Sequence, residues 1–457
     1  MNTAASRSAR RAYIAQLRVK RIFWICLFVV IALFPLVVAA INNTTNGTWR
    51  AVPREIGSFA GMLGLSLMIL SFIPIMREKK ITSAFNLDVV YKFHHSCSIL
   101  GFWLVVFHLV ALWINNQEIG RLVNIFADYP LYIKAGPIAL LAAGCLVYFS
   151  YFRKELKLNY DYWKIGHSLL AILMVVFGLI HTFGVNYYSG NALIHGYYVF
   201  LTVLAAIAIL WLRVFSSLSA MCKPYVIKEV LVRNNATTEL RLEFAGKGNQ
   251  KPIRYHAGQI AWITVRHSRF SFKEHPFSIA SSDVDQNKIG FAIRELGDFT
   301  ATIKDLKPGE IVYVEGGFGI FNPYILGDEG FVLIAGGIGI APVMGILRSM
   351  ADRKDRRHVV LYYGSRDKES IGFYDELNEL SKKLNLEVVH VLEKTDDPSF
   401  EKGYVTKDVI ERHYPKNKDR YDVFICGPGP MVQIVLPALK KIGIPKENIW
   451  PEFYDMA

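Results

Sequence analysis

Four histidines have the residue type and the spacing to hold a metal cofactor. His94 and His108 lie fourteen residues apart in one apolar stretch of the sequence. His167 and His181 lie at the same spacing in a second apolar stretch. In a helix, at about 100° per residue, the members of each pair fall within about 40° of one face and about 21 Å apart along the axis. Two such helices facing each other would therefore offer two levels of paired imidazoles.

A pair of imidazoles from facing helices provides the two axial ligands of a six-coordinate haem. The first level would join His94 with His167. The second would join His108 with His181, and the two haems together would carry electrons along the helices. His95 is the alternative to His94 as a ligand. It lies 13 residues before His108, and this spacing turns it roughly 140° away from His108 around the helix. The alternative is that these histidines hydrogen-bond between helices or relay protons, and two equally spaced pairs favour haem over it.

The elements that must position these histidines are membrane helices. The chain has 457 residues, 52% of them apolar, and its long uncharged apolar runs end near residue 220. Each run matches the roughly 20 residues that a membrane helix needs. The first is too long for a signal-peptide core and ends without a small-residue cleavage site, so we expect it to be retained. The six predicted spans are 22–41, 57–76, 93–114, 135–152, 165–185 and 191–212.

The placement of lysine and arginine predicts the orientation of these spans. Basic residues precede the first span and fill the loops after the second and fourth: Arg7, Arg10, Arg11, Arg18, Lys20, Arg21, Arg77, Lys79, Lys80, Arg153, Lys154 and Lys157. The opposite loops carry mainly Arg50, Arg54, Arg121 and Lys134. We therefore expect both termini and everything after residue 222 in the cytosol. The net charge of +13 then reflects topology and gives no reason to expect nucleic acid as a partner.

The composition and the cysteines exclude several classes of protein. A chain of this length and apolar content is neither disordered nor a small secreted scaffold. Its five cysteines lie far apart and contain no C-x-x-C pair, so neither a zinc site, a cysteine-held cluster nor a disulfide framework is expected. They are Cys26, Cys97, Cys145, Cys222 and Cys426.

The second half of the chain reads as soluble sequence of two kinds. Short β-branched runs alternate with turns over 225–321 and predict a small antiparallel β-barrel. From about residue 329, strands at 331–335, 359–363, 387–392 and 423–426 alternate with amphipathic helices, as in a parallel, doubly wound α/β sheet. The expected domains are a six-helix transmembrane bundle at 1–222, a barrel at 223–326 and an α/β domain at 327–457. The short link at 213–223 predicts that the soluble half lies close beneath the membrane.

Three turns in the predicted barrel have residues that could bind a flavin nucleotide. In the first, His275, Pro276, Phe277 and Ser278 close a strand, and the Ser278 hydroxyl could meet the reactive edge of the flavin. The second offers an arginine, a glycine turn and a helix start to a pyrophosphate, through Arg294, Gly297, Asp298 and Thr300. The third contains Gly317. Each alone is compatible with an ordinary turn or cap, and their occurrence in this order favours flavin.

A glycine loop follows the first strand of the α/β domain. Gly336, Gly337, Gly339 and Pro342 stand between that strand and a helix, where main-chain amides meet a phosphate. Proline replaces the last glycine or alanine of a dinucleotide fingerprint and suits the first helical position. After the next strand, Ser365 and Arg366 suit a ribose 2′-phosphate, which favours NADPH over NADH. Arg366 is equally compatible with a solvated surface charge.

Two further segments lie where ligands of such sheets bind. Cys426, Gly427 and Pro428 follow the last predicted strand, although the thiol is also compatible with simple burial. The tail at 450–457 contains Trp450 and Phe453, whose rings could cover a flavin or pack in the core.

These motifs, in this order, resemble the NADPH oxidase and ferric reductase superfamily over nearly the whole chain. The resemblance implies that the four paired histidines bind two b-type haems, and that the soluble half is a ferredoxin-NADP reductase-like module. It implies that residues 275–278 and 294–300 hold FAD, and that Gly337, Gly339, Pro342, Ser365, Arg366 and Cys426 frame NADPH. Phe453 would stack on the flavin, although four residues follow it here. Without a calcium-binding loop before the first span, we expect a compact, constitutively active prokaryotic member in the inner membrane.

The expected reaction carries electrons from cytosolic NADPH through FAD and two haems to an extracytoplasmic acceptor. Catalytic roles at the flavin fall to Phe453, Cys426 and Ser278. The favoured acceptor is oxygen, which would give superoxide; a ferric chelate or a quinone is the alternative. A different class of function is a six-helix channel or transporter with a nucleotide-sensing domain, in which the histidines relay protons. The sequence gives no sign of an obligate protein partner.

Overall fold

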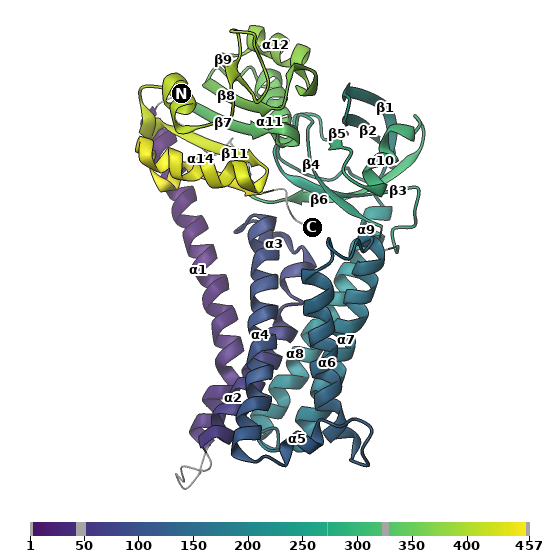
Figure 1. The fold of residues 1–457 in the computed structure, drawn as a ribbon. Helices are drawn as coiled ribbons and strands as arrows, with labels where there is room; N and C mark the ends of the chain where they lie inside the picture. Colours follow the sequence, from purple (N-terminus) through teal and green to yellow (C-terminus); the bar gives the residue numbers. More distant parts are fainter. Residues whose placement is uncertain (1–2, 43–51, 272, 322–328, 454–457) are drawn as a thin grey trace. The chain divides into compact units, whose positions relative to one another are not determined.

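The computed structural model describes residues 3–42, 52–271, 273–321 and 329–453 (Figure 1). The chain forms two compact units. The first, which we call the helical unit, comprises Arg21–Glu78 and Val90–Phe215. The second, the sheet unit, comprises Met1–Lys20, Lys79–Val89 and Ser216–Ala457.

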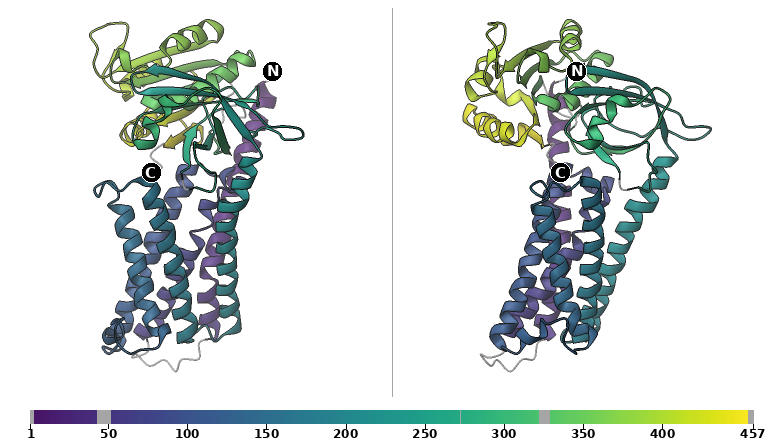
Figure 2. Two further views of the ribbon diagram at one scale, coloured as in Figure 1. Left: turned by 90° about the vertical axis from the view of Figure 1, so that its right-hand side faces the viewer. Right: turned by 45° about the vertical axis from the view of Figure 1, so that its right-hand side comes forward.

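The long helices of the helical unit run side by side in the views of Figure 2. Among the described residues, six helices are long and apolar enough to cross a membrane, which confirms the six-helix prediction. They are α1 (Thr3–Asn42), α2 (Val52–Leu70), α4 (Leu87–Asn115), α6 (Leu131–Tyr151), α7 (Tyr160–Val185) and α8 (Ala192–Leu210). Shorter helical segments are η1 (Pro74–Met76), α3 (Lys79–Thr82), α5 (Ile119–Leu122), the π-helical turn η2 (Trp211–Phe215) and α9 (Ser216–Met221).

Local sequence fixes the ends of these helices. Asn159 and Asn191 cap α7 and α8, because each side-chain oxygen accepts hydrogen bonds from main-chain N–H groups two and three residues later. Asn186 ends α7 in the left-handed conformation, which asparagine tolerates. Helix α2 is mostly buried, whereas at most 22% of the most apolar window is buried in each of the other five long helices. Such exposure is what lipid-facing helices require.

The first helix is longer than the apolar run that predicted it. The sequence indicated 22–41, but α1 begins at Thr3, and its 40 residues span about 60 Å. Its first part belongs to the sheet unit, where Leu17 is buried in the core. Arg10 donates hydrogen bonds of 2.8 and 3.1 Å to the buried Asp422 and one of 2.7 Å to Asn448. These contacts explain why the helix extends through sequence too polar for a membrane.

Six antiparallel strands form the first sheet of the sheet unit, in the order β4-β3-β6-β1-β2-β5. An isolated antiparallel bridge between Ile279, directly after β4, and Phe291 of β5 links the two edge strands. Inward-facing side chains of the strands form one core cluster, so the predicted antiparallel architecture is confirmed. The elements are β1 (Pro224–Asn234), β2 (Thr237–Phe244), β3 (Ile260–Val265), β4 (His275–Ser278), β5 (Lys288–Arg294), α10 (Asp298–Ala301), η3 (Ile303–Asp305) and β6 (Ile311–Phe318).

The second sheet is parallel throughout, in the order β10-β9-β8-β7-β11-β12. The four predicted strands are present, and β10 and β12 add an edge on each side. Its strands are β7 (Gly330–Gly336), β8 (His358–Ser365), β9 (Leu386–Leu392), β10 (Glu401–Lys402), β11 (Tyr421–Gly427) and β12 (Ile449–Phe453). Its helices are η5 (Gly337–Gly339), α11 (Ile340–Asp352), η6 (Lys368–Ser370), α12 (Tyr374–Lys383), α13 (Lys407–His413), η7 (Lys418–Arg420), α14 (Gly429–Ile442) and η8 (Lys446–Asn448).

Strand β7 shows why this sheet is covered on both faces. Phe331 and Leu333 join a core cluster that contains residues of α11 and α12. The alternate residues Val332 and Ile334 join a second cluster with residues of α13 and α14. Side chains alternate along a strand, so a continuous apolar run must be buried on both faces. This confirms the doubly wound α/β architecture.

A buried ion network joins the two sheets. Arg348 of α11 donates to Glu239 of β2 at 2.7 Å and to Glu376 of α12 at 2.6 and 2.8 Å. Arg233 also pairs with Glu239. Although burial opposes its charge, Glu239 has a pKa below its ordinary value because Arg348 and Arg233 stabilise the carboxylate. The network fixes the barrel against the α/β sheet.

Candidate functional site

Two pairs of imidazole rings lie between α4 and α7 of the helical unit. The ring centres of His94 and His167 are 6.3 Å apart. Those of His108 and His181 are 6.4 Å apart. His95 is exposed on α4. The structure thus brings the four spaced histidines together as the two pairs that their spacing predicts.

Hydrogen bonds at Nδ1 fix the tautomer of three of these rings. His94 donates to the main-chain oxygen of Ser71 at 2.9 Å, and His108 donates to that of Gly57 at 2.8 Å. His181 donates to the main-chain oxygen of Tyr132 at 3.0 Å. A carbonyl oxygen can only accept, so Nδ1 carries the proton in each case and Nε2 keeps its lone pair. Nε2 is then available as a metal ligand.

The ring spacing fits an iron ion between the two members of each pair. With metal–nitrogen bonds of about 2 Å on both sides and about 1.2 Å from each ring centre to its nitrogen, the expected spacing is about 6.4 Å. Both observed spacings agree with this value. Among the described residues, no three or more His, Cys, Asp or Glu side chains cluster as a metal cage. A haem iron needs only two protein ligands, and the paired rings suit it.

Two glycines allow helices to approach these rings. A Cβ atom on Gly61 of α2 would stand 2.8 Å from Nδ1 of His108. A Cβ atom on Gly136 of α6 would stand 3.0 Å from Nδ1 of His181. Neither glycine was singled out from the sequence, because a helical glycine gives no signal of what faces it.

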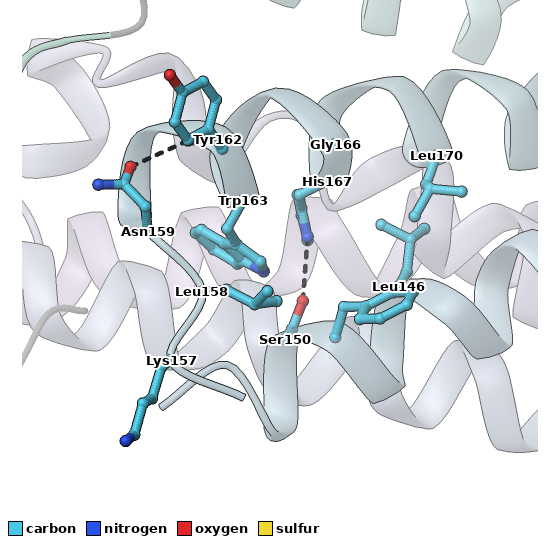
Figure 3. A pocket seen from close by; sticks show the side chains of 11 residues that line it. Leu146, Ser150, Lys157, Leu158, Asn159, Tyr162, Trp163, Gly166, His167 and Leu170 are labelled. Carbon is cyan, nitrogen blue, oxygen red and sulfur yellow. Dashed lines mark hydrogen bonds between the residues drawn. The ribbon is translucent and has the colours of Figure 1, made fainter. Parts of the chain in front are cut away.

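A cavity of about 420 Å³ borders His167 and is lined by residues of α6, α7 and the turn between them (Figure 3). Ser150 points toward His167, and its hydroxyl oxygen lies 3.1 Å from Nδ1. Trp163 lies beside the same ring, with ring centres 5.1 Å apart. Its indole Nε1 is buried without a hydrogen-bond partner among the described residues. This leaves a donor for a ligand that fills the cavity, and neither Ser150 nor Trp163 stood out in the sequence.

Two of the basic residues expected on the opposite side of the membrane, Arg54 and Arg121, have acidic or aromatic partners. Arg54 donates to the Tyr187 hydroxyl, and its guanidinium lies 4.2 Å from the centre of that ring. Tyr187 in turn donates to Glu55 at 2.6 Å. Arg121 pairs with Glu118 at 2.7 Å. Arg50 lies outside the described residues.

In the sheet unit, the first two predicted flavin motifs are brought together. The rings of His275 and Phe299 stack, with centres 3.8 Å apart and planes 16° apart. Arg294 extends toward the glycine loop, because a Cβ atom on Gly337 would stand 3.2 Å from its guanidinium. The flavin motifs and the nucleotide loop therefore meet at one place.

Several predicted binding residues also have purely structural roles. The Thr300 hydroxyl accepts hydrogen bonds from the N–H groups of Gly297 and Leu296 at 2.9 and 2.8 Å. It thereby closes the turn that starts α10 at Asp298. Gly317 has φ +81°, and a Cβ atom there would stand 2.4 Å from the Arg254 carbonyl oxygen. The close approach of the Arg254 main chain therefore also requires a glycine at this position.

The glycine loop lies against the end of β11. A Cβ atom on Gly339 would stand 2.0 Å from the carbonyl oxygen of Cys426, so only glycine fits there. Gly427 and Pro428 follow directly, and Gly427 lies opposite Phe453 of β12 in register. Pro342 is the third residue of α11, not the first as expected, because the 3-10 turn η5 leads into the helix. It still lies in the first turn, where its missing N–H costs nothing.

The predicted 2′-phosphate residues end β8. Ser365 is buried and Arg366 is exposed. Their main-chain oxygens accept hydrogen bonds from Glu393 and Lys394 at the end of β9. The Asp367 carboxylate accepts from the N–H of Ser370 and caps η6.

The end of β12 holds a buried carboxyl group that the sequence analysis missed. Glu452 is 2% exposed, and neither of its oxygens has a hydrogen-bond partner among the described residues. Burial, together with the nearby Asp88 carboxylate, raises its pKa well above the ordinary value. Burial likewise raises the pKa of the Cys426 thiol, so Cys426 is not a thiolate. The sequence feature that could have pointed to this buried group is the acidic residue between Pro451 and Phe453.

The tail is described only in part. Trp450 is buried, donates to Asp422 at 3.0 Å and stacks on Phe424, so it packs in the core and does not cover a flavin. The main chain of Phe453 belongs to β12, but its side chain and residues 454–457 lie outside the described part.

Comparison with known families gives three matches along the chain. Residues 60–178 match the ferric reductase like transmembrane component. Residues 226–313 match an FAD-binding domain, and residues 333–436 match an oxidoreductase NAD-binding domain.

Curated relatives match less than half of the chain. The reductase component of propane 2-monooxygenase from Rhodococcus jostii is 34% identical over 198 residues, which are 40% of this chain and 51% of the relative. The ferredoxin reductase component of 3-ketosteroid-9-alpha-monooxygenase from Rhodococcus rhodochrous is 29% identical over 222 residues, 48% of this chain and 58% of the relative. The chain thus spans about half the length of these relatives. Among solved structures, the Amycolatopsis cytochrome P450 reductase aligns with a TM-score of 0.44 and 24% identity, over 51% of this chain and 69% of that one.

Proposed function

We propose that this membrane oxidoreductase carries electrons across a membrane. The proposal starts from its NADPH oxidase and ferric reductase architecture. The electrons pass from cytosolic NADPH through FAD and two b-type haems to an acceptor on the other side. The membrane is the bacterial inner membrane, with both termini in the cytosol. Residues 1–222 hold the haems, 223–326 the FAD and 327–457 the NADPH.

The observation that carries this proposal is the spacing of the imidazole pairs. Rings 6.3 and 6.4 Å apart, with Nε2 left as the ligand atom in three of them, suit two six-coordinate irons. Histidines that merely relay protons would need no such spacing. His94 with His167, and His108 with His181, would hold the two haem irons.

In the sheet unit, the residues divide between the two nucleotides. His275, Pro276, Phe277 and Ser278 hold the flavin ring, and Arg294, Gly297, Asp298, Thr300 and Gly317 hold its phosphates. Gly336, Gly337, Gly339, Pro342, Ser365, Arg366, Cys426, Gly427 and Pro428 hold NADPH. The contact between Arg294 and the Gly337 loop supports a shared site.

When bound, NADPH supplies a hydride to flavin N5 and the reduced flavin supplies single electrons to haem. The chain's own residues position these groups and handle the proton. Phe453 would cover the flavin ring, and the neutral Cys426 thiol would line the nicotinamide side. Ser278 would hydrogen-bond the ring edge, and burial raises the pKa of the Glu452 carboxyl, which precedes Phe453 in β12, well above its ordinary value.

The favoured acceptor is molecular oxygen, which would give superoxide. Because histidine would fill both axial positions of each iron, the acceptor has no iron site to bind and reacts at the haem edge. A ferric chelate is the second candidate, and it requires a surface that attracts anions. The acidic partners of Arg54 and Arg121 reduce that attraction and favour the small neutral acceptor.

Haem content tests the electron path. Purified protein should contain two haems per chain, and His181→Leu should contain one, while NADPH still reduces its flavin. Two haems in that variant would refute the ligand assignment. A wild-type protein without a Soret band would instead support a channel or transporter with a nucleotide-sensing domain.

The acceptor is tested with FAD-supplemented protein in detergent. NADPH consumption in air is followed beside cytochrome c reduction with and without superoxide dismutase, and then with a ferric chelate under argon. Strong sensitivity to the dismutase supports the oxidase. Negligible superoxide with rapid anaerobic iron reduction would make the protein a ferric reductase.

A further inference from the structure

The four paired histidines differ in what accepts their Nδ1 proton. His94, His108 and His181 donate to main-chain carbonyl oxygens of three different segments. His167 alone among the four has a side-chain partner, the hydroxyl of Ser150 at 3.1 Å. Figure 3 shows Ser150 on α6 and His167 on α7 directed toward each other.

Iron binding would fix the direction of this hydrogen bond. A ligating Nε2 needs its lone pair, so Nδ1 of His167 carries the proton and donates to the Ser150 oxygen. An acceptor at the far nitrogen orients the ring and makes the ligating nitrogen more basic. A more basic ligand stabilises ferric over ferrous iron and lowers the reduction potential. Ser150 therefore acts on the iron through His167.

We propose that Ser150 is a positioning residue that orients His167 and sets the reduction potential of the haem held by His94 and His167. The inference rests on the proposed haem function. A hydroxyl is one rotatable group, whereas the carbonyl partners of the other histidines belong to the main chain. Ser150 is thus the acceptor among these four that a single substitution removes.

The surroundings support a specific role. Ser150 lies next to the last residue of α6, where its hydroxyl and the Trp163 ring flank His167 from two sides. Both residues line the cavity described above. Ser168 provides a matched comparison, because it is the neighbour of His167 in sequence but its hydroxyl donates to the Lys164 carbonyl oxygen at 2.8 Å.

The test measures haem potentials by spectroelectrochemistry in single-haem backgrounds. The His181→Leu variant keeps the haem of His94 and His167, and there Ser150→Ala should raise the potential. We expect about a threefold higher ratio of reduced to oxidised haem at fixed potential, which corresponds to about 28 mV for one electron. Ser150→Thr, which retains a hydroxyl, should restore the parent value, and Ser168→Ala should match the parent.

The outcomes separate this inference from the function on which it rests. In the His167→Leu background, which keeps only the other haem, Ser150→Ala should leave the potential unchanged. Loss of haem from Ser150→Ala but not from Ser168→Ala in the His181→Leu background would also support the positioning role. An unchanged potential in the His181→Leu background would overturn the inference while leaving the proposed haem ligands in place. A wild-type protein without haem would overturn the proposed function itself.

Discussion

At the scale of single residues, burial and charge decide which side chains take part in chemistry. Arg366 is exposed at the end of β8, beside the main chain of Lys394, where a nucleotide ribose is expected. The guanidinium can form charge-assisted hydrogen bonds to a 2′-phosphate, and NADH has no such phosphate. We therefore expect Arg366 to favour NADPH over NADH.

Arg366→Ala should weaken the binding of NADPH far more than the binding of NADH. A charged hydrogen bond contributes about 1.5 to 3 kcal/mol, so we expect KM for NADPH to rise roughly tenfold to a hundredfold. Steady-state kinetics with each nucleotide measure this, and Lys441→Ala, an exposed cation on α14, is the control. An equal effect on both nucleotides would mean that Arg366 does not recognise the phosphate.

Glu452 should make the stability of the folded protein depend on pH. Its folded pKa lies above the unfolded value, so the stability that protonation contributes is complete in acid and is lost as pH rises toward the folded pKa. The amide in Glu452→Gln is neutral at every pH. At pH 8 this variant should therefore have a Tm about 3 °C above that of the wild type, which corresponds to roughly 1 kcal/mol of unfolding free energy. The difference should vanish near pH 4.

Thermal unfolding of the FAD-loaded protein between pH 4 and pH 8 measures the effect of Glu452→Gln. Glu447→Gln, on an exposed residue of η8, is the matched control. A constant difference between Glu452→Gln and wild type at every pH would show that folding does not shift the pKa of Glu452.

At the scale of elements, close helix contacts hold the ligand rings. Gly136→Ala should push α6 away from His181, because the added methyl carbon would stand 3.0 Å from Nδ1 and Cε1 of that ring. We expect haem content to fall from two per chain toward one, as measured by the pyridine haemochrome spectrum. Gly196→Ala on α8 meets nothing within 4 Å and should keep both haems. If Gly136→Ala keeps both haems, α6 and α7 can move apart enough to accept the added methyl group.

The same scale shows what sequence reasoning can and cannot predict. The paired histidines and six helices were predictable, because helical periodicity and bilayer thickness impose fixed spacings. Ser150 was not, since its contact with His167 depends on the rotation of α6 against α7. Arg10 was counted only as a topology signal, yet it binds Asp422 412 residues away. Contacts between distant segments leave no periodic pattern in one sequence.

At the scale of the whole molecule, the chain divides into a unit that binds nucleotides and a unit that holds the imidazole pairs. His94 and His167 each lie seven residues after the start of their helices, at Leu87 and Tyr160. The segment before α4, Lys79–Val89, belongs to the sheet unit. Along α4, His94 is therefore nearer to the sheet unit in sequence than His108 is, and we expect the pair that contains His94 to receive electrons first.

This order predicts different results for the loss of either haem. In His108→Leu, the remaining haem should be reduced by NADPH under argon at about the wild-type rate. In His94→Leu, that rate should fall by at least about tenfold, because the electron must then cross the additional ~21 Å of helix. Stopped-flow absorbance at the Soret band measures both rates, and flavin bleaching in the same traces shows that the nucleotide site remains intact. Equal haem reduction in the two variants would mean that electrons enter both levels directly and that the haems do not act in series.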